Sequence, residues 1–225
     1  MGTTHSSIEL SIIKDKIESS LFLFATELLG FKDITWKTHG KTITALEADT
    51  SRKLIVLPRG SLKSSIACVA YPIWLLLKNP NERICIDSEV YENSSKFLRE
   101  IRVLLEKPIL KALYGSFRGP VWTDSELQIN QRTIPKPQAS ITAMGVTTSR
   151  VGQHYSTVIC DDLNSDKNSF TIEQREKVIN HYKMMTSILD PGGKLILIGT
   201  RYHELDVIGH VIKNELTDAQ RGITE

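Results

Sequence analysis

The feature that most restricts the fold of this chain is a short apolar run that ends in a polar, glycine-containing turn. Residues 53–57 are followed by Pro58 and Gly60, and then by an apolar segment over residues 66–77. A short apolar run bounded by turn residues is typical of a buried strand, whereas a longer apolar segment is typical of a helix. The pattern therefore predicts a strand, a tight loop and a helix, in that order.

The loop between this strand and this helix carries two side chains that suit a phosphate ligand, Lys63 and Ser64. In phosphate-binding loops a lysine binds the β- and γ-phosphates, a hydroxyl binds Mg²⁺, and backbone N–H groups at a helix start surround the anion. The usual pattern has glycines where Leu57 and Leu62 stand here, so the loop by itself fits an ordinary strand–turn–helix equally well.

Two later segments end in polar side chains that would suit the same phosphate–Mg²⁺ ligand. Residues 155–160 form a β-rich apolar run that ends in Asp161 and Asp162, which is the form of a Walker B strand. Residues 194–199 form another apolar run, and Thr200 follows it. Ligands of open α/β sheets bind outside the carboxyl ends of the strands, so we expect the three strand ends to meet in one crevice.

In order and spacing, these segments resemble the ATPase domain of the large terminase subunit of tailed bacteriophages. The resemblance covers about residues 30–212, and its parts are Leu-Pro-Arg-Gly-Ser-Leu-Lys-Ser-Ser at 57–65, Ser-Arg-Val-Gly at 149–152 and Ile-Gly-Thr-Arg-Tyr-His-Glu-Leu-Asp-Val-Ile-Gly at 198–209. The family's loop commonly has Pro-Arg-Gly-x-Gly-Lys-Ser, so Leu62 replaces a usual glycine. The resemblance implies an α/β fold of the P-loop NTPase (RecA-like, ASCE) type, a three-layer sandwich with a mostly parallel central sheet and helices on both faces.

The resemblance further implies an ATP site with Mg²⁺. Lys63 and the loop amides would hold the β- and γ-phosphates, while Ser64 and Asp161 would position the cation. The nucleotide-binding candidates are Trp36, His39, Arg59, Gly60, Ser61, Leu62, Lys63, Ser64 and Ser65. Trp36 could stack on the adenine and His39 could hydrogen-bond it, and core or helix packing is the alternative for both residues.

Four residues are the candidates for catalysis, namely Lys63, Arg150, Asp162 and Thr200. Asp162 would orient the attacking water, although related motors usually have the longer glutamate there. Arg150 matches the family's arginine shortly before the Walker B strand and would act as an arginine finger on a neighbouring subunit. Thr200 would couple the γ-phosphate to movement. The alternatives are that the two carboxylates face solvent, that Arg150 is a surface arginine and that Arg59 packs the loop.

The chain is predicted to form a single P-loop ATPase domain over residues 1–225. An amphipathic helix over residues 7–29 ends at Gly30 and serves either to pack on the domain or to dock a partner. The core occupies about residues 30–212, and residues 213–225 begin a linker or tail. The nuclease domain of the family's proteins is absent from this sequence, so we expect the chain to be a truncated form.

Local patterns predict the remaining elements. We expect strands at 82–87 and 140–145, an antiparallel pair of strands at 126–129 and 132–134, and helices over 87–105 and 205–216. Thr171 and Gln174 form a capping box that opens a helix ending near Leu189. Residues 191–193 stop that helix and start the last strand.

Composition restricts the partners. The formal net charge of +2 is too small to identify a nucleic-acid binder, so any DNA contact must come from a local patch. Lys96, Arg99 and Arg102 share one helix face, which could follow DNA phosphates or simply face solvent. The three cysteines lack the spacing of metal ligands, and no apolar stretch is long enough to predict a membrane span.

The predicted function is ATP hydrolysis that translocates double-stranded DNA into a viral procapsid. The resemblance implies four partners: double-stranded DNA, the portal protein, a small terminase subunit and further copies of the chain in a ring. The place of action would be the host cell cytoplasm, at the procapsid portal. A helicase-like or other ring translocase is an alternative enzyme. A nucleotide-binding assembly module with little turnover is the alternative without catalysis, because Leu62 replaces a loop glycine.

Overall fold

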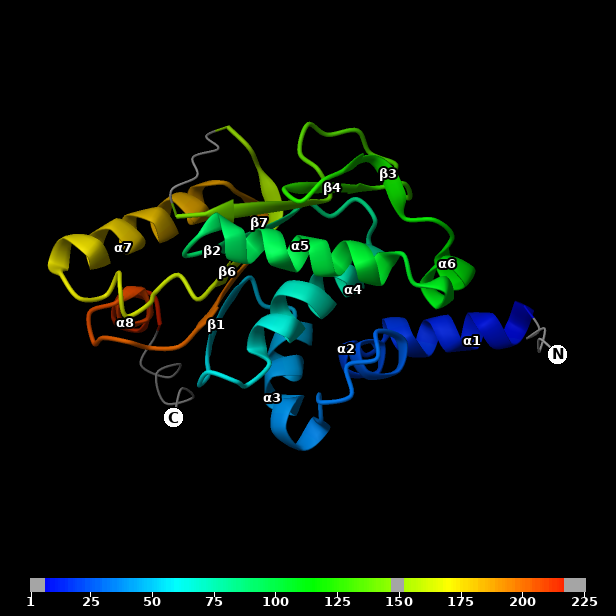
Figure 1. Ribbon diagram of the computed structural model, residues 1–225, viewed down its shortest axis with the longest axis horizontal. Coiled ribbons are helices and arrows are strands. Elements are labelled where there is room, and N and C mark those ends of the chain that lie inside the picture. The colour runs from blue at the N-terminus through cyan, green and yellow to red at the C-terminus, as the bar shows by residue number, and fades with distance from the viewer. Residues whose placement is uncertain (1–6, 147–151, 217–225) are drawn as a thin grey trace.

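A mixed sheet of seven strands forms the centre of the protein (Figure 1). The computed structural model describes residues 7–146 and 152–216, and within them the strand order is β1-β7-β6-β2-β5-β4-β3. The strands are β1 (Arg52–Val56), β2 (Ile84–Ser88), β3 (Arg118–Trp122), β4 (Glu126–Ile129), β5 (Ile141–Gly145), β6 (Tyr155–Asp161) and β7 (Leu189–Gly199). Neighbouring strands from β1 to β5 are parallel, whereas β4 pairs antiparallel with both β5 and β3.

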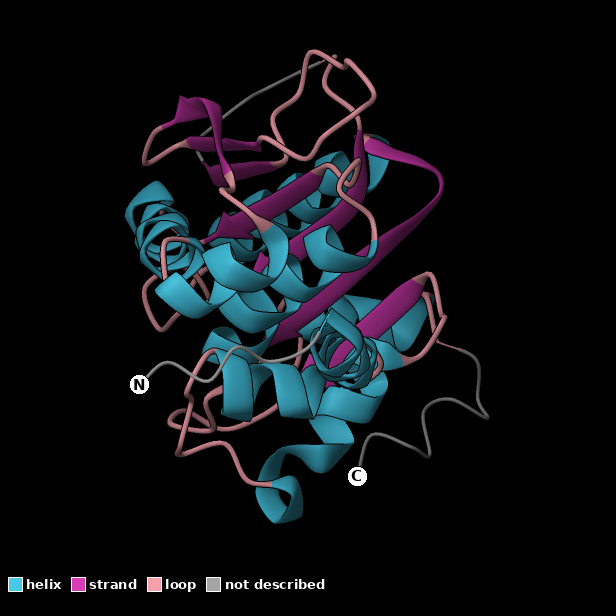
Figure 2. Ribbon diagram, turned by 90° about the vertical axis from the view of Figure 1, so that its right-hand side faces the viewer, coloured by secondary structure: helices cyan, strands magenta, loops and turns pink. Residues whose placement is uncertain are grey.

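Helices cover both faces of this sheet (Figure 2), so the protein has an α/β fold. The helices are α1 (Ser7–Glu18), α2 (Leu21–Leu23), α3 (Trp36–Glu47), α4 (Tyr71–Lys78), α5 (Tyr91–Leu105), α6 (Pro108–Tyr114), α7 (Ile172–Ser187) and α8 (Val207–Asn214), with π-helical segments η1 (Phe24–Leu28) and η2 (Ser65–Ala70). None of them, in the part of the chain that the structure describes, combines the length and apolar character that crossing a membrane requires.

The alternation of side chains along the strands explains the two helical layers. Ile84 and Ile86 of β2 belong to a core that also contains η2, α4 and α5, whereas Cys85 between them belongs to a second core with α7 and α8. Because successive side chains of a strand point to opposite faces, one continuous apolar strand supplies both cores. We call the two sides of the sheet the η2 face and the α7 face.

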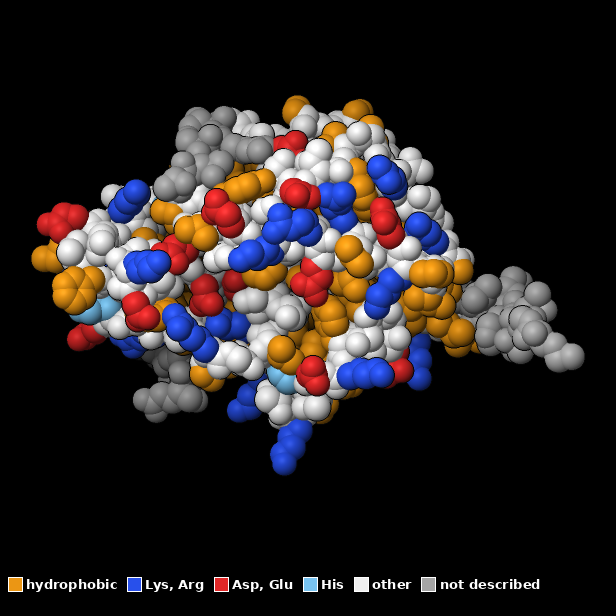
Figure 3. All heavy atoms as spheres, in the orientation of Figure 1, with side chains coloured by type: hydrophobic (Ala, Val, Ile, Leu, Met, Phe, Trp, Pro, Cys, Tyr) orange, Lys and Arg blue, Asp and Glu red, His pale blue; other side chains and the backbone are white. Residues whose placement is uncertain are grey.

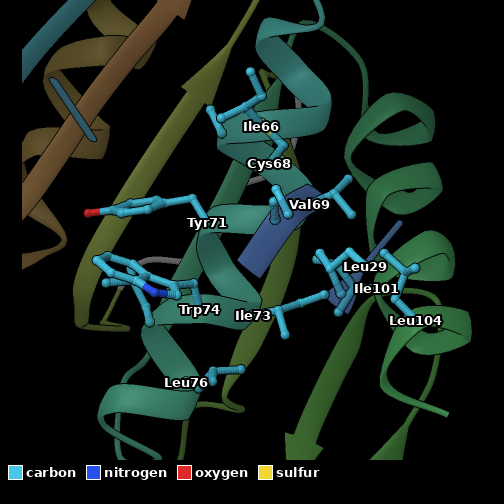
Figure 4. Packing of buried hydrophobic residues seen from close by; sticks show 14 of the residues in the cluster. Leu29, Ile66, Cys68, Val69, Tyr71, Ile73, Trp74, Leu76, Ile101 and Leu104 are labelled. Atoms are coloured by element: carbon cyan, nitrogen blue, oxygen red, sulfur yellow. The ribbon is translucent and has the colours of Figure 1, made fainter. Parts of the chain in front are cut away.

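The larger core holds the helix that follows the predicted loop. η2 continues directly into α4. Ile73 of α4 extends toward Ile101 of α5 and toward Leu29 (Figure 4). All three side chains are buried. Burial of this kind is the main stabilising contribution in folding. The start of η2 is therefore held in a fixed position beside the sheet.

The N-terminal helical region differs from the prediction of one helix over residues 7–29. The chain forms α1, α2 and η1 instead, because Ser20 adopts an extended conformation and its hydroxyl accepts a hydrogen bond from the N–H of Leu23. The N–H of Leu21 donates to Glu47 Oε1 at 2.6 Å, a tertiary contact that helical periodicity cannot reveal. The predicted stop is found at Gly30, whose φ is +78°.

The antiparallel pair also differs from the prediction. The strand at residues 126–129 forms as expected, but β3 is its hairpin partner, and residues 132–134 form no strand. In the sequence, Gly119 and Pro120 are typical of a loop rather than of a strand. In the structure, a Cβ at Gly119 would lie 2.2 Å from the carbonyl oxygen of Gln128. The close approach of the two strands requires glycine here.

The last strand begins earlier than predicted. β7 starts at Leu189, and its register against β6 shifts where residues 190–193 lie opposite Ser156. Gly192 has a φ of +77°, so the Pro-Gly-Gly sequence forms an irregularity within the strand rather than preceding it. Helix α7 ends at Ser187, and both hydrogen bonds of the predicted Thr171 capping box are present.

The predicted basic face of α5 is not a free stripe of positive charge. Arg99 and Arg102 both form ion pairs with Asp124. On the face shown in Figure 3, basic and acidic side chains are interspersed over α5. Paired arginines are weaker phosphate ligands than free ones, so the alternative of a solvated face agrees better with these contacts.

Candidate functional site

The ends of β1, β7 and β6 lie side by side at one edge of the sheet. Val56 pairs in register with Gly199, and Asp161 pairs with Ile198. Since the three strands are parallel, the loops that follow them emerge at the same edge. The structure therefore brings the loop after β1 together with the ends of β6 and β7, although Ser64 is 97 residues from Asp161 and Lys63 is 137 residues from Thr200 in the sequence.

The loop after β1 is fixed to β7 at its beginning and carries an unusual backbone at its end. The N–H of Leu57 donates to the carbonyl of Gly199 at 3.0 Å, and the Thr200 hydroxyl donates to the carbonyl of Leu57 at 2.9 Å. Gly60 and Leu62 have positive φ values, +78° and +53°. A left-handed backbone is uncommon for leucine, so Leu62 holds a conformation that glycine adopts without strain.

Lys63 lies at the centre of the strand ends. Its side chain is 6% exposed, and its ammonium group donates to Thr200 Oγ1 at 3.3 Å and lies 3.2 Å from Asp162 Oδ2. A buried ammonium group needs such partners, because loss of hydration would otherwise destabilise it. One lysine thus connects the ends of all three strands.

Ser64 and Asp161 form a second contact between the loop and β6. The Ser64 hydroxyl lies 2.8 Å from Oδ1 and 3.0 Å from Oδ2 of Asp161. Burial, followed by the nearby charge of Asp162, raises the pKa of Asp161 to about 7, although hydrogen bonds from Ser64 and the thiol of Cys68 and the charge of Lys63 act in the opposite direction. The carboxylate is therefore kept in a poorly hydrated environment.

Asp162 also contacts both other strand ends. Its Oδ1 accepts a hydrogen bond from the N–H of Thr200 at 3.0 Å, while Oδ2 pairs with Lys63. Its φ is +41°, in the left-handed region. Neither of the two strand-end carboxylates simply faces solvent, as the alternative interpretation of the sequence proposed.

The remaining loop residues have different surroundings. Arg59 donates to the hydroxyl of Tyr202 at 3.0 Å from Nε and 2.6 Å from Nη2, and lies 3.8 Å from Asp166. Its side chain is 68% exposed, so it is not simply packed in the loop. Ser61 Oγ is buried and has no hydrogen-bond partner among the residues described. Ser65 begins η2.

Trp36 and His39 lie on α3. Trp36 is 56% exposed and makes an edge-to-face contact with Phe22, with ring centroids 5.4 Å apart. His39 is buried, and its Nδ1 lies 3.0 Å from the backbone nitrogen of Thr35, the N-cap residue of the same helix. These contacts explain both residues as packing residues, and their role toward an adenine stays a prediction. Arg150 lies outside the described residues.

Sequence reasoning missed two neighbours of Asp161. Cys68, for which the sequence indicated no ligand role, donates its thiol to the carboxylate. The signal was its position four residues after Ser64, since residues at this spacing share a helix face. Ser88 of β2 pairs with Asp161 in register, which could not be found without the strand order.

A second buried pair lies one residue back from this edge, on the α7 face. His181 of α7 and Asp87 of β2 are in contact, with Nε2 2.7 Å from Oδ2. Burial raises the pKa of Asp87, and the contact with His181 lowers it. The pair joins α7 to the sheet from the face opposite to Ser64, so it is separate from the candidate site.

Convergent polar groups define the site. A groove of about 490 Å³ lies elsewhere, along the start of β1, where residues 49–54 and Glu215 line it. No group of three or more His, Cys, Asp and Glu side chains within 7–146 and 152–216 is arranged to hold a metal ion. A Mg²⁺ site needs no such group, because this ion commonly uses one or two carboxylates together with substrate phosphates and waters.

Comparison with known proteins gives one distant similarity. No family model matches this chain. Over 182 residues the chain is 29% identical to "Terminase, large subunit" of Enterobacteria phage T3, an alignment that covers 78% of this chain and 29% of that protein. The chain therefore spans less than a third of the length of this relative. The weak similarity supports a relationship to the terminase family, and the mixed sheet with helices on both faces is compatible with it.

Proposed function

We propose that this chain is the P-loop ATPase domain of a viral motor that hydrolyses ATP to translocate double-stranded DNA into a procapsid. The observation that carries this proposal is the convergence on one loop: Lys63 contacts Thr200 and Asp162. The adjacent Ser64 contacts Asp161. The similarity to a terminase large subunit supports it independently.

The residues present fit a magnesium–triphosphate ligand. Lys63 and the loop amides hold the β- and γ-phosphates, and the unpartnered hydroxyl of Ser61 is available to a phosphate oxygen. Ser64 and Asp161 supply a hydroxyl and a carboxylate, the oxygen ligands that Mg²⁺ prefers. When bound, the cation would neutralise charge on the phosphate oxygens.

Asp162 orients the attacking water in this proposal. In the present structure its two oxygens contact the ammonium group of Lys63 and the N–H of Thr200. A bound phosphate competes with Asp162 for Lys63, since both are anions. Arrival of the nucleotide therefore frees one carboxylate oxygen to accept a proton from water. The same exchange transmits the presence of the γ-phosphate to Thr200 and the loop after β7.

The other predicted residues keep their proposed roles. Arg150 acts as an arginine finger on a neighbouring copy of the chain, and Arg59 reaches a phosphate in cis after leaving Tyr202. Trp36 and His39 line the adenine. The partners are double-stranded DNA, the portal protein, a small terminase subunit and further copies in a ring, at the procapsid portal in the host cell cytoplasm.

Nucleotide binding and hydrolysis test the central claim. A fluorescent ATP analogue is titrated into the chain with Mg²⁺, and phosphate release is followed over a range of protein concentrations, because assembly into the proposed ring would depend on concentration. We expect binding and turnover by the wild type and loss of both in Lys63→Ala. Equal binding by Lys63→Ala would refute the proposal. Asp162→Asn should bind normally and release phosphate slowly, and an unchanged rate would remove Asp162 from the mechanism.

A mixing experiment tests action in trans. Arg150→Ala and Lys63→Ala are each expected to be inactive alone. If Arg150 acts on a neighbour, a mixture of the two regains part of the activity, because some intact nucleotide sites then meet an intact arginine. Absence of any rescue, under conditions where wild-type subunits assemble, would contradict this assignment.

A second candidate function is a nucleotide-binding assembly module with little turnover. The left-handed backbone of Leu62 favours it, because the strained loop position is where the family has glycine. This candidate predicts tight binding in the titration but no phosphate release at any protein concentration. A helicase-like translocase differs from both, since it would separate DNA strands in a standard unwinding assay.

A further inference from the structure

Ser88, the last residue of β2, carries a buried hydroxyl that lacks a partner. The residue is 2% exposed, and its Oγ makes no hydrogen bond to any residue that the structure describes. A buried hydroxyl without a hydrogen bond destabilises the folded state, since it has lost its contacts with water and gained none. Such a group is therefore a candidate for contact with a ligand.

The position of Ser88 ties it to the candidate site. Ser88 pairs in register with Asp161 of the parallel neighbour β6, and paired strands lie about 5 Å apart. Two residues earlier in each strand, Ile86 and Ile159 belong to the core of the η2 face. Because side chains alternate along a strand, Ser88 and Asp161 share that face. It is also the face from which Ser64 contacts Asp161.

The other side of Ser88 is closed by backbone. Its partner on β5 is Gly145, where an added Cβ would lie 2.4 Å from the N–H nitrogen of Tyr91 at the start of α5. Any side chain at position 145 is thus excluded, so none can reach the Ser88 hydroxyl from β5 at that position. The neighbouring side chain in the same row of the sheet is the carboxylate of Asp161.

We infer that Ser88 is a positioning residue for the cation of this site, through a hydrogen bond between its hydroxyl and a water of the Mg²⁺ hydration shell. The inference rests on the proposed ATPase function. Mg²⁺ usually keeps several of its waters in protein sites, and these waters need hydrogen-bond partners. A hydroxyl can both donate and accept, so it suits a bound water beside a carboxylate. Asp161 already accepts hydrogen bonds from Ser64 and Cys68.

The test compares Ser88→Ala with a matched control, Thr142→Val. Thr142 on β5 is also buried and its hydroxyl also lacks a partner among the described residues, but it pairs with Cys85, three residues before the edge. Ser88→Ala removes a hydroxyl, and Thr142→Val replaces one with a methyl group of similar size. For each, Mg²⁺ is titrated at a fixed concentration of a fluorescent ATP analogue, and unfolding by urea is measured without Mg²⁺ and nucleotide.

We expect Ser88→Ala to need about 10-fold more Mg²⁺ for half-maximal binding, since outer partners of a metal site commonly contribute this much to affinity. Its stability without Mg²⁺ should equal or exceed that of the wild type, because an unpartnered buried group has been removed. Thr142→Val should match the wild type in Mg²⁺ dependence. Ser88→Cys, with a weaker hydrogen-bonding group of similar size, should give an intermediate Mg²⁺ requirement.

Two results would overturn the inference while leaving the ATPase proposal intact. One is an unchanged Mg²⁺ dependence in both Ser88 variants, provided that Lys63→Ala still abolishes nucleotide binding. The other is a reduced Mg²⁺ affinity that appears only together with lower stability without Mg²⁺, which would show a structural role for the hydroxyl. A wild-type chain that binds no nucleotide at all would overturn both proposals.

Discussion

Replacing Asp161 with asparagine is expected to stabilise the protein at pH 8 and to leave its stability unchanged near pH 4. The carboxyl group is 4% exposed, and burial raises its pKa from 3.8 to about 7. Between these two values the folded state binds more protons than the unfolded state, so stability falls as the pH rises through this window. Above pH 7 the folded protein keeps a buried, ionised group whose removal should be favourable.

The magnitude follows from the pKa difference. A difference of about 3 units corresponds to about 4 kcal/mol at pH 8, at 1.36 kcal/mol per unit. Asparagine has nearly the same shape and retains an oxygen that accepts from the Ser64 hydroxyl, so little packing is lost. For a domain of this size, the melting temperature of Asp161→Asn should exceed that of the wild type by roughly 10 °C at pH 8.

Chemical unfolding of both proteins at several pH values between 4 and 8 checks this expectation. Asp49→Asn is the control, because the side chain of Asp49 is 97% exposed and its ion pair with Lys194 is a surface one. It should change stability by less than about 1 kcal/mol. A stability of Asp161→Asn at pH 8 that equals or falls below that of the wild type would refute the reasoning, as would a gain that persists at pH 4.

Three further predictions concern the same region. Thr200→Val removes the hydrogen bond to the Leu57 carbonyl and the acceptor of Lys63, and we expect kcat for phosphate release to fall at least about 10-fold with little change in KM; normal turnover would contradict a coupling role. Leu62→Gly should be about 1 kcal/mol more stable to urea than Leu62→Ala, since only alanine retains the cost of the left-handed backbone; equal stabilities would show that the loop relaxes. Gly209→Ala should lower stability by about 2 kcal/mol, because the new Cβ would lie 1.9 Å from the carbonyl oxygen of Glu204; an unchanged melting temperature would disprove the clash.

The strands and the polar residues at their ends could be predicted from the sequence because their signals are local. Apolar runs followed by polar residues identify strands that end at a common edge, and parallel pairing brings Lys63, Asp162 and Thr200 together. The capping box at Thr171 is equally local, since its two hydrogen bonds lie within one helical turn. Roles in binding and catalysis stay predictions, because geometry alone does not test them.

The features that escaped prediction depend on contacts between distant segments. The break before Leu21 involves the side chain of Glu47, and the partner of β4 is a segment that looks like a loop because of Gly119. The position of Ser88 beside Asp161 depends on the pairing of β2 with β6, which no pattern within either strand reveals. Sequence periodicity describes which way a side chain points, but not what it meets.

The left-handed backbone at Asp162 has a consequence for the choice of acid at that position. Two consecutive residues of a pleated strand reach opposite faces, yet Asp161 and Asp162 both contact side chains of the loop after β1. The φ of +41° at Asp162 interrupts the alternation of the strand, so the second carboxylate points to the same side as the first. Aspartate and asparagine are among the few residues besides glycine that tolerate such a turn. A glutamate would reach further but would fit this left-handed backbone less well. The backbone conformation therefore favours the shorter acid at this position.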